Sequence, residues 1–409
     1  MTQPPAARPR LKRALTLPYV VLYGLGVTIG AGIYVLVGEV IALSGDHAPI
    51  SFLIASLVML LPAACFAELT GRMPFAAAEA HFVRAGFNSP TLFLIVGLGV
   101  AAVGIVSSSA IAHGAAGYIV ELIDVPYMVV LAVVIAMTGI VACFGIRESI
   151  LFAGALTLIE IGGLVILVLG AFWSGADLGE QAVKSVPTSF SPALWSGIFA
   201  SGLLSFFAFI GFEDIDSIAE ETVNPQKTLA QGIFLTLGLT LVLYTFVVLA
   251  ALATVPITEL SESRAPLALV FDRTTGLSPI TISLIAILAT VNGIIVQIIM
   301  AGRVIYGLAN EGALPAFLAR VSARTRTPVI ATAISTLIVL TLALGFTITA
   351  LAEWTSVITL VIFVLVCLAL ARIKRRNDPA PEGTFIVPHW VPWCGALATL
   401  LLLALGLMT

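Results

Sequence analysis

The chain has 409 residues, of which 60% are hydrophobic and only 10% are charged. A soluble domain carries about 25% charged residues, so this composition excludes a soluble protein and predicts an integral membrane protein. The formal net charge of -3 says little about partners, because the positions of the charges matter more. Basic residues do not cluster with aromatic ones, so nucleic acid is not an expected partner, whereas the lipid bilayer is. The four cysteines lack metal-ligand spacing, and neither a metal nor a cofactor is expected.

The hydropathy pattern predicts an all-α protein, because a membrane-spanning helix needs about 20 mainly apolar residues. About eleven segments meet that rule, and they cover approximately residues 15–43, 49–70, 90–122, 126–144, 149–173, 192–219, 228–255, 278–309, 328–345, 348–371 and 387–408. Residues 1–14 form a polar, basic tail. Nearly all of the 19 Lys and Arg residues fall on one side if that tail is cytoplasmic. The positive-inside rule therefore predicts a multi-pass protein of the cell (inner or plasma) membrane, with a cytoplasmic N-terminus and an external C-terminus.

The first span contains the glycine-rich run Gly24-Leu-Gly26-Val-Thr-Ile-Gly30-Ala-Gly32-Ile-Tyr34. Each glycine in a helix costs about 1 kcal/mol relative to alanine, so the run is poorly suited to a rigid helix. Unwound backbone in a membrane persists only where it is buried in protein or lines a cavity. One interpretation is therefore a helix that is broken at a binding site. The alternative is that the glycines allow two helices to pack closely.

Glu160 lies near the middle of the apolar span 149–173. A carboxylate near the centre of the bilayer costs at least about 2.5 kcal/mol on insertion scales, so Glu160 must face the protein interior or be neutral. An ionisable residue at this depth is a functional candidate, and the alternative is a structural partner on a neighbouring helix.

The span 192–219 contains a second interruption, since Glu213 and Asp214 follow Gly211 in the middle of an apolar run. An unwound segment that lines a cavity would lower the cost of burying these acids. Two interrupted helices whose starts are five spans apart are typical of transporters built from two inverted repeats, with the binding site between the repeats. This pattern favours the binding-site interpretation of the run Gly24 to Gly32. Asn292, on the span 278–309, is a polar candidate for coupling or gating.

Three stretches occur in order along the chain: the glycine-rich run that ends at Tyr34, the run from Phe206 to Glu213 that continues to Asn224-Pro225, and the run from Arg303 to Pro315 with the later Thr327-Pro328. Together they resemble the amino acid–polyamine–organocation (APC) transporter superfamily. The resemblance implies a LeuT-like fold with broken helices 1 and 6. Residues 15–173 would form the first inverted repeat, residues 192–371 the second, and residues 387–408 an additional helix.

The resemblance also implies site residues. Backbone amides at the helix 1 break would hold a substrate carboxylate, here at Gly30, Ala31 and Gly32, and carbonyl oxygens would hold its ammonium group, here near Thr28, Phe207, Ala208 and Ile210. Phe207 matches an aromatic gate, and Glu213 matches an acid tied to proton-dependent gating. Glu160 stands where some members carry a lysine whose ammonium replaces a sodium ion. We therefore expect Glu160, Glu213 and Asn292 to act in coupling or gating.

The expected function is secondary active transport of amino acids by alternating access, through proton-coupled symport or amino acid exchange. The alternatives are a sodium-coupled transporter of amino acids or a polyamine transporter, and, less favoured, a channel for amines or ions. An enzyme is not expected, because the chain has no HExxH or GxSxG motif and no clustered set of His and Asp.

Overall fold

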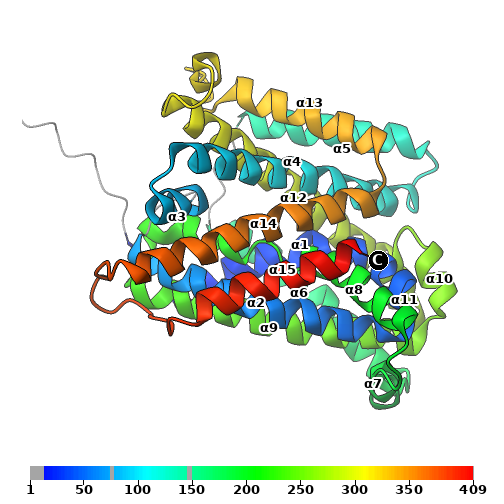
Figure 1. The fold of residues 1–409 in the computed structure, drawn as a ribbon. Helices are drawn as coiled ribbons and strands as arrows, with labels where there is room; N and C mark the ends of the chain where they lie inside the picture. Colours follow the sequence, from blue (N-terminus) through cyan, green and yellow to red (C-terminus); the bar gives the residue numbers. More distant parts are fainter. Residues whose placement is uncertain (1–12, 74–77, 145–149, 409) are drawn as a thin grey trace, which may run out of the picture.

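The computed structural model describes residues 13–73, 78–144 and 150–408 (Figure 1). Residues 1–12 of the predicted tail therefore lie outside the described chain. Helices dominate the described residues, where the only β pairing is an isolated bridge between Leu15 and Thr222. The apolar sequence explains this, because in lipid a helix satisfies all of its backbone hydrogen bonds internally.

Each predicted apolar span coincides with a helix, and the span 192–219 continues beyond its helix into a turn and a 3-10 helix. The long helices are α1 (Leu17–Ser44), α2 (Ala48–Arg72), α4 (Pro90–Val120), α5 (Tyr127–Phe144), α6 (Ile150–Trp173), α8 (Pro192–Phe207), α9 (Pro225–Thr254), α12 (Ile280–Asn310), α13 (Val329–Gly345), α14 (Ile348–Arg375) and α15 (Val391–Leu407). The shorter elements are the helices α3 (Ala78–Phe87), α7 (Leu178–Ser185), α10 (Ile257–Glu262) and α11 (Pro266–Thr275) and the 3-10 helices η1 (Gly45–His47), η2 (Phe212–Glu221) and η3 (Ala316–Ala319).

Eight helical stretches of the described chain are long and apolar enough to cross a membrane, one of which passes through η1 from α1 into α2. The first part of α1, at residues 17–30, and the helices α13 and α15 are apolar but shorter than these stretches. The outward faces carry large apolar side chains: Met137, Leu337 and Leu397 are 57%, 64% and 59% exposed. A soluble protein rarely shows such surfaces in contiguous patches, whereas a lipid-facing surface requires them. The prediction of an all-α membrane protein is confirmed.

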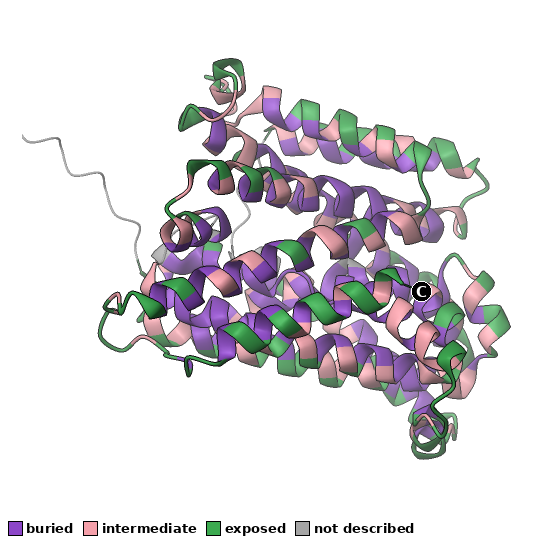
Figure 2. Ribbon diagram, in the orientation of Figure 1, coloured by how far each residue is buried: buried purple, intermediate pink, exposed green. Residues whose placement is uncertain are grey.

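The helices form one bundle. Helix α1 and the interrupted segment formed by α8 and η2 pack against one another within it. Helices α5 and α13 pack together at one edge, followed by α4 with α12, and then by α14, α15 and α2 (Figure 1). Exposed residues lie in the loops and on the outer faces of the helices, as on α5, α13 and α15, and buried residues concentrate between the layers (Figure 2). This arrangement surrounds the glycine-rich half of α1 with α6, α8, α9 and η2.

The predicted break in helix 1 is not found. The backbone of α1 is helical from Leu17 to Ser44, including the whole run Gly24 to Gly32. The physical reason is packing: a Cβ on Gly24 would lie 2.5 Å from Thr236 Oγ1 of α9, and one on Gly26 would collide with Thr157 of α6. The glycines let neighbouring helices approach closely while α1 keeps its own hydrogen bonds. The close-packing alternative is therefore correct for Gly24 and Gly26.

Candidate functional site

The predicted interruption of the sixth span is confirmed. Helix α8 ends at Phe207, residues 208–211 form a turn, and the chain continues as the 3-10 helix η2 from Phe212. Gly211 has φ 121°, a conformation that residues with a side chain rarely adopt. A Cβ at Gly211 would also lie 3.0 Å from the carbonyl oxygen of Val27 on α1. Glycine is therefore needed here both for the turn and for the close approach to α1.

Two contacts hold α1 against this interrupted segment. Gly32 packs on Ala208 so closely that a Cβ on Gly32 would collide with the Ala208 backbone. At the other end of η2, the amides of Ala14 and Leu15 donate to the carbonyl oxygen of Glu221 at 2.9 and 3.0 Å. The turn at 208–211 and the whole of η2 are thus fixed along the first half of α1.

Tyr244 of α9 joins α1 to the turn. Its hydroxyl group lies 3.0 Å from the carbonyl oxygen of Thr28 and 3.1 Å from that of Ala208, and it is completely buried. These are two of the carbonyl groups that the resemblance assigns to a substrate ammonium group. The single phenol hydrogen is thus shared between a carbonyl group of α1 and a carbonyl group of the turn.

Glu160 of α6 faces the protein interior, as predicted. It is 2% exposed, and its Oε2 atom has no hydrogen-bond partner among the described residues. That atom lies 4.0 Å from where a Cβ on Gly30 would be, so the carboxyl group faces α1 at Gly30. Tyr34 fixes the α6 backbone at this level by donating to the carbonyl oxygen of Glu160 at 2.8 Å. A buried, unpaired carboxyl group beside a glycine is suited to bind a proton or a cation.

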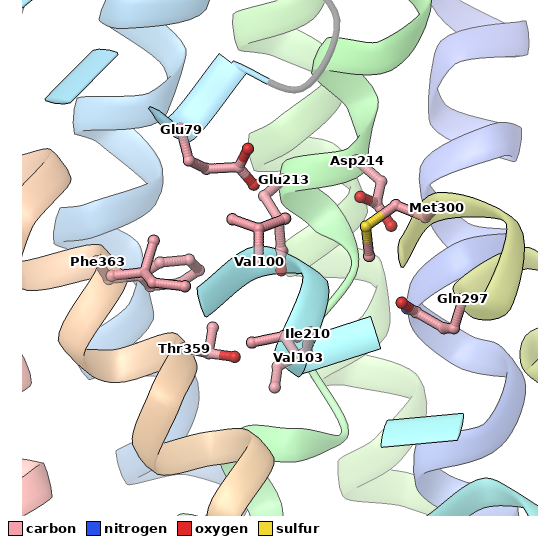
Figure 3. Close-up of a pocket in the computed structure, with 11 residues that line it drawn as sticks. Glu79, Val100, Val103, Ile210, Glu213, Asp214, Gln297, Met300, Thr359 and Phe363 are labelled. Atoms are coloured by element: carbon pink, nitrogen blue, oxygen red, sulfur yellow. The ribbon is translucent and has the colours of Figure 1, made fainter. Parts of the chain in front are cut away.

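A narrow cavity lies next to the turn (Figure 3). Polar side chains reach it from three elements around Ile210: Glu79 from α3, Glu213 and Asp214 from η2, and Gln297 from α12. Helix α14 adds Thr359, and the valines of α4 close one wall. The space open to the centre of a water molecule is about 20 Å³. Roughly 10–15 Å³ suffices for one water, so the cavity is sized for a water molecule rather than for an amino acid.

The carboxyl group of Glu213 makes a hydrogen bond within the turn itself. Its Oε2 atom accepts a hydrogen bond of 2.9 Å from the amide of Gly211, and the side chain is 7% exposed. The carboxyl group therefore caps the turn that interrupts the helix. Among the described residues, no three His, Cys, Asp or Glu side chains are grouped as metal ligands are.

The structure brings most of the predicted site residues together. Thr28 and Gly32 lie on the side of α1 that faces α9 and the turn, where Phe207, Ala208 and Ile210 are all buried. Gly30 instead faces Glu160 of α6 and the backbone of Ala289 on α12. Ala31 lies within α1, and its side chain is outside the described part of the structure. Asn292 is half-buried on α12 and is not among the residues that line the cavity.

Sequence reasoning missed two residues of this region. Glu79 was the one acid in a short segment of small residues after the second span, which is a signal that could have identified it. Tyr244 gave no such signal, because an aromatic residue in an apolar span is usually a core residue. Both are placed at the turn only by tertiary packing.

The fold and this region together define an all-helical membrane protein with one helix interrupted beside buried carboxyl groups. A family model described as amino acid permease matches residues 15–409. The chain therefore belongs to the amino acid permease family, and the resemblance to APC transporters is confirmed.

Individual relatives are named as transporters or permeases. The chain is 31% identical to cationic amino acid transporter 2, vacuolar, of Arabidopsis thaliana over 91% of its own length and 62% of the relative's. It is 30% identical to cationic amino acid transporter 4, vacuolar, of the same plant, over 89% and 64%. It is 28% identical to the branched-chain amino acid permease BcaP of Bacillus subtilis, over 98% and 89%. The chain thus spans less than two thirds of the length of these plant relatives.

Proposed function

We propose that this protein moves amino acids across a membrane by alternating access, either by proton-coupled symport or by amino acid exchange. The observation that carries this proposal is the turn at residues 208–211, which interrupts a helix inside the bundle and packs directly on Gly32 of α1. A turn of this kind leaves backbone groups without helical partners at membrane depth, and such groups bind substrates in transporters.

In this proposal the site residues have three roles: they bind the substrate carboxylate, they bind its ammonium group, and they couple or gate transport. Gly30, Ala31 and Gly32 would provide amide groups to a substrate carboxylate, and the carbonyls of Thr28, Phe207, Ala208 and Ile210 would accept from its ammonium group. Because α1 is helical here, these amides become available only if α1 opens locally near Gly30. The contacts beside Gly30 are of ordinary van der Waals length, whereas the tight contact at Gly32 opposes such a change.

Glu160, Glu213 and Asn292 would act in coupling or gating. Glu160 and Glu213 are buried acids that no described ion pair includes, which favours protons as the coupling ion. Sodium coupling is the alternative mechanism, because an ionised Glu160 could hold a cation at the same place. We further propose that the N-terminus is cytoplasmic, that the C-terminus is outside, and that residues 15–173 and 192–371 form inverted repeats.

The names of the relatives give two classes of substrate to test. Plant relatives are named for cationic amino acids, and the bacterial relative is named for branched-chain amino acids. Labelled lysine and labelled leucine therefore represent the two classes, with a labelled polyamine as a third probe.

The test is uptake into liposomes that contain the purified protein. Three conditions separate the mechanisms: an inward proton gradient, an inward sodium gradient, and preloaded unlabelled amino acids without either gradient. Accumulation driven by protons, or uptake only after preloading, supports the proposal. Accumulation driven by sodium alone contradicts the proposed coupling, and the absence of amino acid uptake in every condition contradicts the function.

A further inference from the structure

Two carboxyl groups from separate elements meet in the cavity beside the turn. Glu79 lies on α3 and Glu213 on η2, and both side chains line the cavity, with the Glu79 carboxyl group pointing toward Glu213 (Figure 3). They are 8% and 7% exposed. Asp214 reaches the same cavity and is half-buried. The pairing joins α3, which follows the second span, to the interrupted segment.

Aromatic packing explains why these two elements meet. The ring of Phe66 on α2 contacts Phe82 of α3 at 6.1 Å and Phe212 of η2 at 5.8 Å between ring centroids. Phe82 is one turn along α3 from Glu79, and Phe212 precedes Glu213 directly. All three rings are completely buried. The aromatic cluster therefore packs the element that carries Glu79 and the element that carries Glu213 against the same residue of α2.

No described ion pair neutralises the carboxyl groups of the cavity. The described ion pairs join other residues, and the ones nearest in sequence are Arg84 with Glu311 and Arg72 with Glu68. Other titratable or charged residues lie on the elements around the cavity but are not among the residues that line it. They are His81 and Arg84 on α3, His113 and Tyr118 on α4, Asp216, Glu220 and Glu221 on η2, Arg303 and Tyr306 on α12, and Glu353, Cys367, Arg372, Lys374 and Arg375 on α14, with Tyr23 on the neighbouring α1. Arg303 is exposed, and its charge interacts electrostatically with the hydroxyl group of Tyr23. Asp214 interacts electrostatically with the same hydroxyl group. The cavity is thus predominantly acidic.

Buried like charges at close range cannot both remain ionised, so one of two neighbouring carboxyl groups keeps a proton. Burial raises the pKa of the Glu79 carboxyl group, on the short helix α3. The folded protein therefore holds a proton there at pH values at which an exposed glutamate has lost it. The proton leaves as the pH rises through that raised pKa, and any stabilisation that it brings is lost in the same range.

Gln297 supplies an independent indication of a ligand. Its side chain is 9% exposed and lines the same cavity from α12, and its Oε1 atom has no hydrogen-bond donor among the described residues. A buried amide oxygen without a donor costs about 1–3 kcal/mol. Carboxylate oxygens and this amide oxygen are all acceptors, so the cavity is complementary to a small species that donates hydrogen bonds. Its volume of about 20 Å³ fits one water molecule.

We propose that this cavity binds one hydrated proton, shared by Glu79 and Glu213 and hydrogen-bonded through its water molecule to Gln297. A hydronium ion from bulk water transfers the proton: one O–H bond of the hydronium ion breaks, one O–H bond forms at a carboxylate oxygen, and the neutral water molecule that is left stays hydrogen-bonded in the cavity. Binding joins α3 to η2, and release leaves two repelling carboxylates that favour separation of the two elements. The inference rests on the proposed function and identifies where its coupling proton is held.

Infrared difference spectroscopy of the purified full chain tests the site without any transport. A protonated carboxyl group has a C=O stretching band that a carboxylate lacks, so acid-minus-alkaline spectra report each titrating proton. We expect Glu79→Gln and Glu213→Gln each to remove the same band, and the double variant to remove nothing more. Glu79→Asp keeps a carboxyl group and is expected to keep a band at a shifted position. Glu353→Gln, at a half-buried glutamate of α14 outside the cavity, is the matched control and should leave the band intact.

Two results would overturn the proposal. One is a band that persists unchanged in Glu79→Gln or in Glu213→Gln. The other is the loss of different bands in the two variants that add up in the double variant, since two separate protons would then be bound. Failure of the proposed function is distinguishable, because it would appear as absent amino acid transport by the wild type whatever the infrared spectra show. Where transport is present, Glu79→Gln should flatten its dependence on pH, and an unchanged pH profile would count against the site.

Discussion

The contact between Gly32 and Ala208 offers a direct test of how α1 meets the interrupted segment. Replacing Gly32 by alanine places a Cβ in collision with the Ala208 backbone and 2.8 Å from the Ala208 Cβ. The matched variant is Gly30→Ala, in the same helix two residues earlier, where the nearest atoms lie at 3.8 and 4.0 Å. The second variant meets only ordinary van der Waals contacts.

The magnitude follows from two terms. Both substitutions remove a helical glycine, which favours the folded helix by about 1 kcal/mol in each case. Only Gly32→Ala adds an overpacking cost, which is typically about 1–3 kcal/mol. The propensity terms cancel in the comparison, so Gly32→Ala should be less stable than Gly30→Ala by about 1–3 kcal/mol.

The assay is unfolding of the two purified variants and the wild type in the same detergent, followed by intrinsic fluorescence over a denaturant titration. We expect Gly30→Ala to unfold at or above the wild-type midpoint, and Gly32→Ala to unfold below the midpoint of Gly30→Ala. Equal midpoints for the two variants would refute the reasoning, because they would mean that α1 and residue 208 are not in close contact.

Three further substitutions test other contacts. Tyr244→Phe removes the hydroxyl group that bridges two carbonyls and should lower the free energy of unfolding by about 0.5–1.5 kcal/mol, and an unchanged denaturation midpoint would contradict this bridge. Glu160→Gln should weaken the pH dependence of amino acid uptake in liposomes, so a wild-type pH profile would remove Glu160 from the coupling scheme. Glu68→Gln leaves the buried ammonium group of Lys374, 2.8 Å from Glu68 Oε2, without its counter-ion. This change should cost about 3–5 kcal/mol in a denaturant titration, and a loss below about 1 kcal/mol would show that the pair is dispensable.

The sequence by itself determined the fold class and the position of one interruption. Its apolar runs predict the helices, because the bilayer requires spanning helices whatever the neighbours are. The sequence Gly211 followed by Glu213 predicts the break of the sixth span, since only glycine adopts the turn easily and two acids are poorly tolerated in a continuous helix. The burial of Glu160 follows from the same cost of placing a charge in lipid.

Only the tertiary structure decided what the glycines of α1 do. Glycine permits both an unwound backbone and a close helix contact, so Gly24, Gly26 and Gly32 are ambiguous until their neighbours are known. The packing of Thr236, Thr157 and Ala208 against these positions selects the close contact in this structure. The meeting of Glu79 with Glu213, and of Tyr244 with the carbonyls of Thr28 and Ala208, likewise depends on elements far apart in the chain. No local pattern encodes such contacts, because they arise from the way the helices pack in three dimensions.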